Sequence, residues 1–424
     1  MELSYTLRNV LIGSSLLGIV AGVLGSFALL RRQSLLGDAL AHSVLPGICI
    51  AFLLSGMRTT LPLMGGALVT GIAGALLVLA IVRWSRIKQD SAIGIVLSVF
   101  YATGIVLLTR IQRLPGGNQS GLDKFLFGQA AALLEEDLYV MAGLGALVLI
   151  ITMLLFKEFK ILVFDPAFAA SLGFPVRRLE ALLTALLVVI VVFGLQTVGV
   201  VLMVAALVTP AAAARQWTDR LGAMVLLAAG IGGVSGAAGA IASATMARLP
   251  TGPTIVLISS SILVLSLLLA PRRGLLWARL RARAAAARIR REHLLKDLYR
   301  LGEARGRLNE FVSWPELMGV RGQSMRELGR SARRLVREGH LELRADTLRL
   351  TPEGLAEAEK VTRKHRLWEL YLTRRLELAS DHVHRDAEAM EHVLTDAAVA
   401  ELEALLGHPT VDPHGRTIPQ ARRP

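Results

Sequence analysis

Hydrophobic residues dominate the first 270 positions of the chain, and charged residues become frequent after them. The apolar residues form successive runs near the length that a helix needs to cross a bilayer, about 20 residues. Several runs are rich in glycine and alanine, which allows close helix packing in lipid. The pattern predicts an all-α polytopic membrane bundle with spans at about 7–30, 40–56, 61–82, 91–109, 133–156, 181–198, 199–214, 221–247 and 253–270.

The number of spans depends on the sixth and seventh runs, which are contiguous and form either one long or broken helix or two crossings, giving eight or nine spans. Basic residues follow the first, third and fifth runs, and such loops favour the cytoplasmic side. That orientation puts the N-terminus outside, so a cytoplasmic C-terminal part requires nine crossings, the number we prefer. The first run ends at Arg31-Arg32 without a small-residue cleavage site, which indicates a span and not a cleavable signal peptide.

The sequence after Pro271 has the patterns of a soluble protein. Apolar stripes and turn residues predict three helices, an alternating strand hairpin and then a further helix with Thr351 as its cap. Three helices and a hairpin make a winged helix-turn-helix. The predicted elements lie at 286–308, from Ser313 to Met318, at 324–338, at 341–350 and from Thr351 onward.

We therefore expect four parts along the chain. They are a transmembrane domain at 1–271, an Arg-rich juxtamembrane linker or helix at 272–291, a winged helix-turn-helix at 292–354, and a further helical domain at 355–424.

Composition supports this division. The 424 residues are 53% hydrophobic, and one cysteine, Cys49, excludes intrachain disulfides and cysteine-rich zinc sites. Lys and Arg outnumber Asp and Glu by 17 to 11 through Ala270 and by 30 to 22 after it. The linker at 272–291 has eight arginines and no acid, which predicts a cytosolic anchor on anionic lipid. Contact with nucleic acid is the alternative for this segment.

Eight of the nine histidines follow Glu292, and several stand beside glutamates at helical spacing. The chain reads His365-x-x-x-Glu369 and then His384-x-x-x-Glu388-x-x-Glu391-His392. Steps of three and four place such residues on one helix face, and imidazole with carboxylate suits a first-row divalent metal. The alternative is an ordinary solvated helix face.

A second pair, Asp38 and His42, lies inside the membrane half at a spacing of four. Ionisable residues at membrane depth are costly and usually line a pathway. Gly37, Pro46 and Gly47 would allow a broken helix of the kind that transporter sites use. The alternative places the pair at the interface as a cap and a polar anchor.

These residues lie in a stretch, 31-RRQSLLGDALAHSVLPGICIAF-52, that resembles the ABC permeases for manganese, zinc and iron uptake, with further matches at 123–133, 157–178, 195–215 and 249–276. The resemblance implies that Asp38 and His42 contact the metal. It also implies a bacterial plasma-membrane protein that pairs with an identical or different second permease subunit, a separate ATPase and an extracytoplasmic metal-binding protein.

Residues 164–178 resemble the short cytosolic helix through which such permeases receive force from the ATPase. Asp165-Pro166 predicts a helix start, and Gly173 predicts its end. The resemblance assigns coupling to Asp165, Pro166, Ala169 and Gly173. No G-x-x-x-x-G-K-[ST] occurs, so we expect no nucleotide on this chain, which is a transport subunit and not an enzyme.

The segments 350–369, 383–394 and 406–419 resemble the diphtheria-toxin-repressor family of iron- and manganese-dependent regulators. The resemblance implies that the permease domain at 1–271 is followed, after the winged helix, by a helical metal-binding and dimerisation domain at 355–424, in which the His/Glu set is a regulatory metal site with two neighbouring ions. The first helix departs from that family, because His293 stands where a Met or Asp ligand is usual, and Lys296 stands where manganese-type members have an acid. The assigned ligands are His365, Glu369, His384, Glu388, Glu391 and His392, with His293 as a further candidate.

Exposed arginines on the third soluble helix could meet DNA phosphates and base edges; they are Arg326, Arg330, Arg333 and Arg334. We therefore expect a permease for manganese or iron, with zinc as the next candidate, carrying a cytoplasmic metal-responsive domain that regulates transport or transcription. The alternative is a membrane-tethered, metal-dependent DNA-binding regulator.

Overall fold

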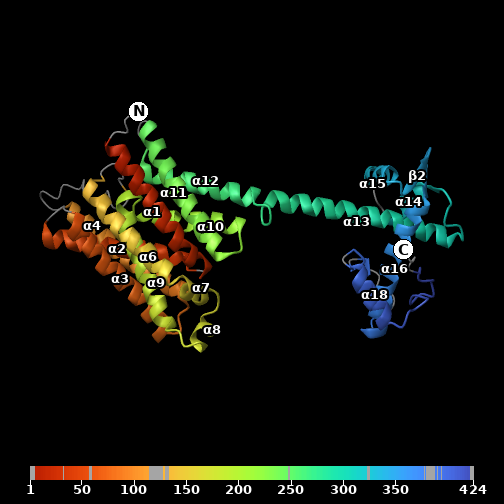
Figure 1. Cartoon of the computed structure of the whole chain (residues 1–424), viewed down its shortest axis with the longest axis horizontal. Coiled ribbons are helices and arrows are strands. Elements are labelled where there is room, and N and C mark those ends of the chain that lie inside the picture. Colours follow the sequence, from red (N-terminus) through yellow and green to blue (C-terminus); the bar gives the residue numbers. More distant parts are fainter. Residues whose placement is uncertain are drawn as a thin grey trace. The chain divides into compact units, whose positions relative to one another are not determined.

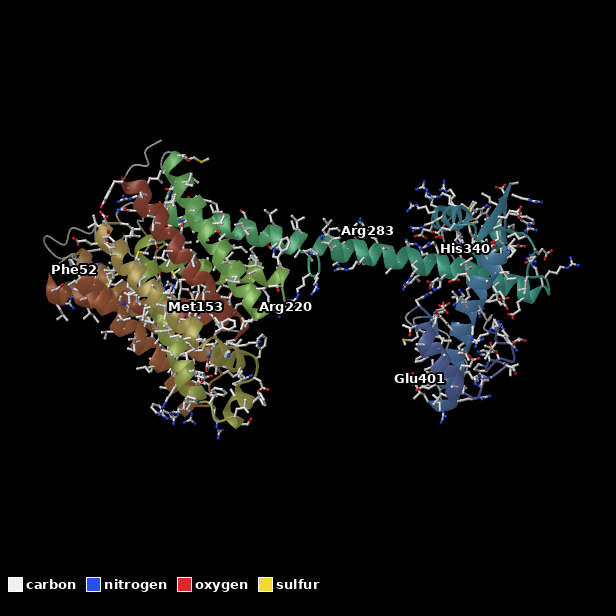
Figure 2. The ribbon with its side chains drawn as sticks, viewed as in Figure 1. Phe52, Met153, Arg220, Arg283, His340 and Glu401 are labelled. Carbon is white, nitrogen blue, oxygen red and sulfur yellow. The ribbon has the colours of Figure 1, made fainter. Side chains whose placement is uncertain are left out.

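The structure is a computed structural model that describes residues 5–31, 33–56, 60–113, 128, 133–246, 249–321, 325–376, 378, 387–388, 390–392 and 394–420. The chain divides into two compact units, Met1–Ala278 and Arg279–Pro424. Figure 2 shows that carbon dominates the side chains of the first unit, whereas nitrogen and oxygen are frequent at the surface of the second.

The first unit is a bundle of helices, as expected from the apolar runs (Figure 1). Among the described residues, eight helices are long and apolar enough to cross a membrane: α1 Tyr5–Leu30, α2 Ser34–Ser55, α3 Thr60–Trp84, α4 Gln89–Gln112, α6 Glu135–Leu154, α9 Val176–Thr197, α11 Leu221–Thr245 and α12 Thr251–Leu269. Three shorter helices accompany them: α7 Phe156–Phe164, α8 Pro166–Ser171 and α10 Val200–Trp217.

The contiguous sixth and seventh runs form two helices, α9 and α10, separated at Val198 and Gly199. Gly199 has φ 87°, a conformation that favours glycine and breaks the helix there. The 18-residue α10 contains Pro210, packs on α1, α2, α11 and α12, and is not one of the eight long apolar helices. The nine crossings preferred from loop charge are therefore reached only if α10 also crosses.

Helices α1 and α11 lie side by side with their backbones in close contact (Figure 1). A Cβ atom built on Gly18 would lie 2.1 Å from the carbonyl oxygen of Gly232, and one on Gly236 would lie 2.2 Å from that of Ser14. Since lipid supplies no hydrophobic force between helices, such close approach provides the dispersion contacts that hold the bundle together.

The broken helix that Gly37, Pro46 and Gly47 would allow does not form, because α2 is one continuous helix through Pro46. Proline removes one backbone donor but does not have to interrupt a membrane helix when its neighbours support it. Gly47 has a packing role instead, since an added Cβ would lie 2.1 Å from the carbonyl oxygen of Gly66 in α3.

The second unit begins within the long helix α13 and continues with a winged helix. Its elements are α13 Leu275–Ala304, β1 Val312–Ser313, α14 Trp314–Arg321, α15 Met325–Arg337, β2 Leu341–Arg344 and β3 Thr347–Leu350. The strands form an antiparallel sheet in the order β1-β3-β2, with Leu343 opposite Leu348 and Val312 opposite the same Leu348. The helices and hairpin were expected; β1 was not, because two residues give no alternating pattern.

Leucines on α13 hold this part together. Leu294, Leu295 and Leu298 are buried against α14, α15 and the sheet, as the predicted stripe requires. Each buried leucine contributes about 1.5–3 kcal/mol relative to exposure. The stripe therefore fixes one face of α13 against the winged helix. The orientation of the remaining faces of α13 follows from this packing.

Two further helices, α16 Pro352–Arg375 and α18 Asp396–Leu405, complete the unit. The Thr351 hydroxyl accepts a hydrogen bond from the Gly354 amide at 3.0 Å, so it caps α16 as predicted. A second small core joins these helices through Leu367, Leu370 and Leu402. This packing aligns α16 so that His365 and Glu369 are buried.

Candidate metal centres

The candidate pathway pair lies on α2, where the His42 Nε2 is 3.4 Å from an Asp38 carboxylate oxygen. The His42 ring meets Tyr101 of α4 edge-on, with centroids 4.8 Å apart. The His42 Nδ1 is buried and has no hydrogen-bond partner among the described residues. An imidazole and a carboxylate with an unused ring nitrogen suit transient binding of a divalent ion.

The candidate coupling element is the short helix α8. The Asp165 carboxylate accepts a hydrogen bond from the Phe168 amide at 2.9 Å, and Pro166 occupies the first turn. After the helix, Gly173 has φ 84°, which ends it. The start and end thus match the sequence expectation.

One side of helix α8 is buried against the bundle, and another side carries exposed apolar residues. Ala169 is 1% exposed, whereas Phe168 and Leu172 are 53% and 54% exposed. Such apolar side chains in a short helix between two longer ones offer a compact surface for another protein.

In the soluble unit the assigned ligands converge on a lysine. The Lys296 Nζ of α13 lies 2.7 Å from both Glu391 carboxylate oxygens, 3.7 Å from Glu388 Oε1 and 3.5 Å from His365 Nδ1. His365 also lies 2.9 Å from Glu369 Oε1 through its Nε2 and 2.6 Å from Glu391 Oε2 through its Nδ1. The side chains of Lys296 and Glu391 are fully buried.

Electrostatics in this cluster favour the charged forms. Burial by itself would raise the pKa of Glu391, but the hydrogen bond from His365 and the Lys296 charge outweigh it and hold that pKa below its usual value. Burial would likewise lower the pKa of His365, but its hydrogen bonds to Glu369 and Glu391 raise it. The cluster is therefore an ion-pair network.

Next to this network, three side chains that can each donate an atom to a metal lie close together. His293 of α13, Glu391 and His392 place one ligand atom each within 4.8 Å of the others. His392 Nε2 lies 2.9 Å from His293 Nε2 and 3.4 Å from Glu391 Oε1, while His293 Nε2 lies 3.7 Å from that oxygen. Ligand atoms around an ion with bonds of about 2.1 Å stand about 3.0–3.4 Å apart, so the separations fit one divalent ion.

The carboxylate of Glu292 orients this group. The His392 Nδ1 lies 2.5 Å from Glu292 Oε2. A carboxylate on the far nitrogen fixes the ring and directs Nε2 to the metal position, as in many metal centres.

The donor set therefore fits a metal at one group of side chains and not at the other. His293, Glu391 and His392 could hold an ion, while an ammonium group lies among Glu391, Glu388 and His365. Glu388 lies near Lys296, and His384 falls outside the described residues.

The predicted DNA-reading arginines are exposed on α15, while Leu328, Ala332 and Leu335 bury its other face. Arg334 pairs with Glu338 at 2.9 Å, and the Arg333 side chain donates to the Gly329 carbonyl. Arg326 and Arg330 complete the basic face.

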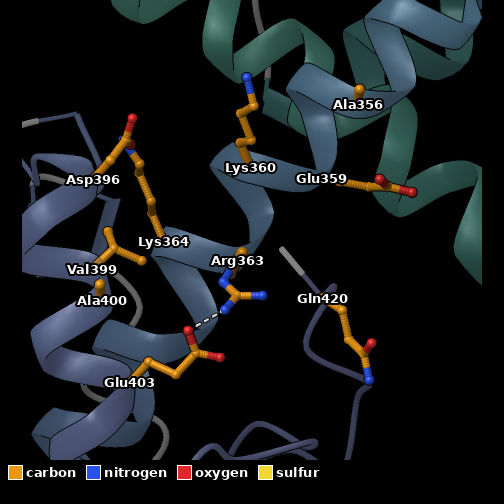
Figure 3. Close-up of a pocket in the computed structure, with 10 residues that line it drawn as sticks. All are labelled: Ala356, Glu359, Lys360, Arg363, Lys364, Asp396, Val399, Ala400, Glu403 and Gln420. Atoms are coloured by element: carbon orange, nitrogen blue, oxygen red, sulfur yellow. Dashed lines mark hydrogen bonds and ion pairs between the residues drawn. The ribbon is translucent and has the colours of Figure 1, made fainter. Parts of the chain in front are cut away.

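Another face of α16 lines a hollow of about 300 Å³ (Figure 3). Its charges are already matched, since Arg363 pairs with Glu403 and Lys364 lies 3.0 Å from Asp396. The hollow contains none of the predicted ligands.

Sequence reasoning missed Glu292 and Tyr101. Glu292 stands beside a recognised histidine, which is a weak signal. Tyr101 is far from His42 in the chain, and only the packing of α2 against α4 brings them together.

Comparison with known proteins covers both units. Residues 4–270 match the family described as "ABC 3 transport family". Residues 351–420 match "Iron dependent repressor, metal binding and dimerisation domain".

Individual relatives agree with this division. The "Manganese transport system membrane protein MntC" of Bacillus subtilis (strain 168) is 44% identical over 89% of this chain and 86% of its own length, so the similarity extends well beyond the bundle. The "Zinc transport system membrane protein TroC" of Treponema pallidum (strain Nichols) is 47% identical over 64% of this chain and 92% of its own.

Among solved structures, "PsaBC from Streptococcus pneumoniae in complex with Fab" aligns with TM-score 0.57 and 35% identity. The alignment covers 63% of this chain and 93% of that one. The family match spans more than half of the sequence, and the described residues of the bundle include eight helices long and apolar enough to cross a membrane. The chain therefore belongs to the ABC 3 transport family, and it carries an iron-dependent-repressor-like domain after its membrane bundle.

Proposed function

We propose that the chain is the permease subunit of an ATP-driven importer of divalent transition metal, with manganese or iron as the favoured cargo and zinc as the next candidate. The observation that carries the proposal is the Asp38/His42 pair, inside a bundle of this family, with a buried imidazole nitrogen that has no partner among the described residues. Asp38 offers carboxylate oxygens and His42 an imidazole nitrogen, and a divalent cation can exchange its hydration for these donors.

The partners follow from the same proposal. A separate ATPase subunit docks on α8, where Phe168 and Leu172 are exposed and Ala169 anchors the helix. An extracytoplasmic metal-binding protein delivers the cargo, and a second permease subunit, identical or different, completes the pathway. The chain is placed in a bacterial plasma membrane with its second unit in the cytoplasm, where the arginines of 272–291 face anionic lipid.

The second unit serves as a cytosolic metal sensor that acts on transport. A divalent ion held by His293, Glu391 and His392 would supply a cross-link between α13 and the segment after α16. Regulation requires that the ion bind two states of the protein with different affinity. The bundle and the sensor lie on one chain, so a change in α13 has a direct covalent route to α12.

A second candidate function is favoured by the exposed basic face of α15. Under that hypothesis the unit is a membrane-tethered, metal-dependent DNA-binding regulator that reads DNA through arginines of α15. Metal-dependent binding of duplex DNA that loses strength steeply with salt and is abolished by Arg330→Ala plus Arg334→Ala would favour it.

The importer proposal is tested by uptake of labelled manganese, iron and zinc into cells that produce the chain with its ATPase and its extracytoplasmic partner. We expect ATP-dependent uptake of at least one of these ions. If none accumulates although the complex assembles in the membrane, the proposal is wrong.

A further inference from the structure

One cation is already built into the metal-binding region of the second unit. The Lys296 side chain is fully buried, and its Nζ is 2.7 Å from each Glu391 oxygen and 3.7 Å from Glu388 Oε1. These are the contacts that a metal ion makes with carboxylates, here made by an ammonium group. A buried lysine persists only when its charge is paired and hydrogen-bonded.

We propose that the Lys296 ammonium permanently takes the place of one of two neighbouring metal ions, so that the second unit binds a single divalent ion at His293, Glu391 and His392. This inference rests on the proposed sensor function and makes it specific. The lysine is part of α13, which the buried Leu294, Leu295 and Leu298 hold in place, so the amine is positioned by the fold.

Geometry excludes a second ion beside the lysine. An ion bound by Glu391 and His365 needs ligand distances of about 2.0–2.2 Å. His365 Nδ1 and Glu391 Oε2 are only 2.6 Å apart, closer than two ligands of one ion, and Nζ lies beside them at 2.7 Å from the carboxylate and 3.5 Å from His365 Nδ1.

The remaining ion position is compatible with the lysine. It lies at Glu391 Oε1, which is 3.4 Å from His392 Nε2 and 3.7 Å from His293 Nε2, and the two imidazole Nε2 atoms stand 2.9 Å apart. Glu391 thus joins both positions, accepting from Lys296 while it contributes one oxygen to the ion. Because Lys296 neutralises part of the acidic cluster, the His365 region stays paired without metal, and binding of the single ion orders chiefly the His293–His392 contact.

The experiment uses the full chain, purified in detergent, in an Asp38→Ala plus His42→Ala background that removes the pathway site. Bound Mn²⁺ is counted by equilibrium dialysis with elemental analysis, and its electron paramagnetic resonance spectrum reports whether two ions are magnetically coupled. We expect about one ion per chain, an uncoupled spectrum, and loss of that ion in His293→Ala plus His392→Ala.

Substitution sharpens the count. Lys296→Glu should create the second position, raising the count to about two with a coupled spectrum, while Lys360→Glu, the same charge change at an exposed lysine, should leave one uncoupled ion. Lys296→Met should not create a second site, because it supplies no ligand.

The outcomes are decisive for the unmutated lysine as well. Two coupled ions in the Lys296 protein would overturn the inference while leaving the sensor function standing. Absence of any saturable ion in the soluble unit would overturn both. Should Lys296→Glu fail to fold, the count and spectrum of the Lys296 protein still decide between one ion and two.

Discussion

Both units pair an imidazole with a carboxylate, but they differ in how deeply the carboxylate is buried and in which side chains surround it. In the bundle, Asp38 is 34% exposed at its side chain and stands 3.4 Å from His42, whose ring meets Tyr101 edge-on. In the soluble unit, Glu391 is fully buried and surrounded by Lys296, His365 and His392. The first arrangement suits an ion in transit, which must leave as readily as it enters. The second suits retention, because surrounding groups fix its ligands in advance.

The largest effect on metal uptake should come from the candidate pathway pair, Asp38 and His42. Asp38→Ala removes the negative charge that offsets the loss of hydration, so we expect metal uptake to fall by roughly 100-fold or more. Labelled-metal uptake, normalised to the amount of protein in the membrane, measures the loss. Asp90→Ala, at the exposed start of α4, is the matched control and should retain uptake. Normal uptake by the Asp38 variant would remove the pair from the pathway.

The next largest effect should be a loss of metal binding by the soluble unit, with no loss of transport. His293→Ala removes one of three ligands and should weaken Mn²⁺ binding by the soluble unit by roughly 10–100-fold, while basal uptake stays near that of the parent. Calorimetric titration of the full chain lacking the pathway pair measures the affinity. His408→Ala, whose side chain is 77% exposed, serves as the control. Equal weakening by both variants would contradict the assigned ligand.

The proposed coupling role of α8 predicts that transport can be lost without loss of metal binding. Phe168→Ala plus Leu172→Ala removes exposed apolar contact area from α8, so assembly with the ATPase should weaken by roughly tenfold or more. Co-purification and metal-stimulated ATP hydrolysis should both fall, and metal affinity at both centres should not change. The control is Met153→Ala, an exposed apolar residue of α6 (Figure 2). Unchanged assembly would place the docking surface elsewhere.

The smallest effect on metal affinity should come from Glu292, which orients the His392 ring. Glu292→Gln keeps the size of the side chain but weakens its bond to His392 Nδ1, so Mn²⁺ affinity should fall by roughly tenfold. The effect should disappear when His392 is already alanine, because Glu292 acts through that ring. An equal loss in both backgrounds would mean that Glu292 contacts the metal or stabilises the unit by another route.

Local features of this fold were predictable from sequence. Asp165-Pro166 and Thr351-Pro352 start helices because capping depends on a few adjacent residues. The apolar runs predicted the bundle because bilayer crossing sets their length. The helix break that Pro46 and Gly47 would allow does not occur, since Gly47 is used for contact with Gly66, and no pattern within one helix distinguishes packing from breaking.

The sites were predictable in residue type more than in arrangement. The spacing of His365, Glu369, Glu391 and His392 indicated metal chemistry, and Lys296 was recognised as opposing it. The Lys296 amine donates hydrogen bonds to both carboxylate oxygens of Glu391. This contact depends on how α13 packs against a segment 95 positions later in the chain. Such a contact leaves no local signal in a single sequence.

The most direct test of a transport protein with its own sensor is uptake by proteoliposomes containing the chain and its ATPase, with Mn²⁺ varied on the side of the soluble unit. The parent should slow as Mn²⁺ on that side rises, and Glu388→Ala plus His392→Ala should keep the basal rate without slowing. The same response to Mn²⁺ in parent and double variant would contradict the account.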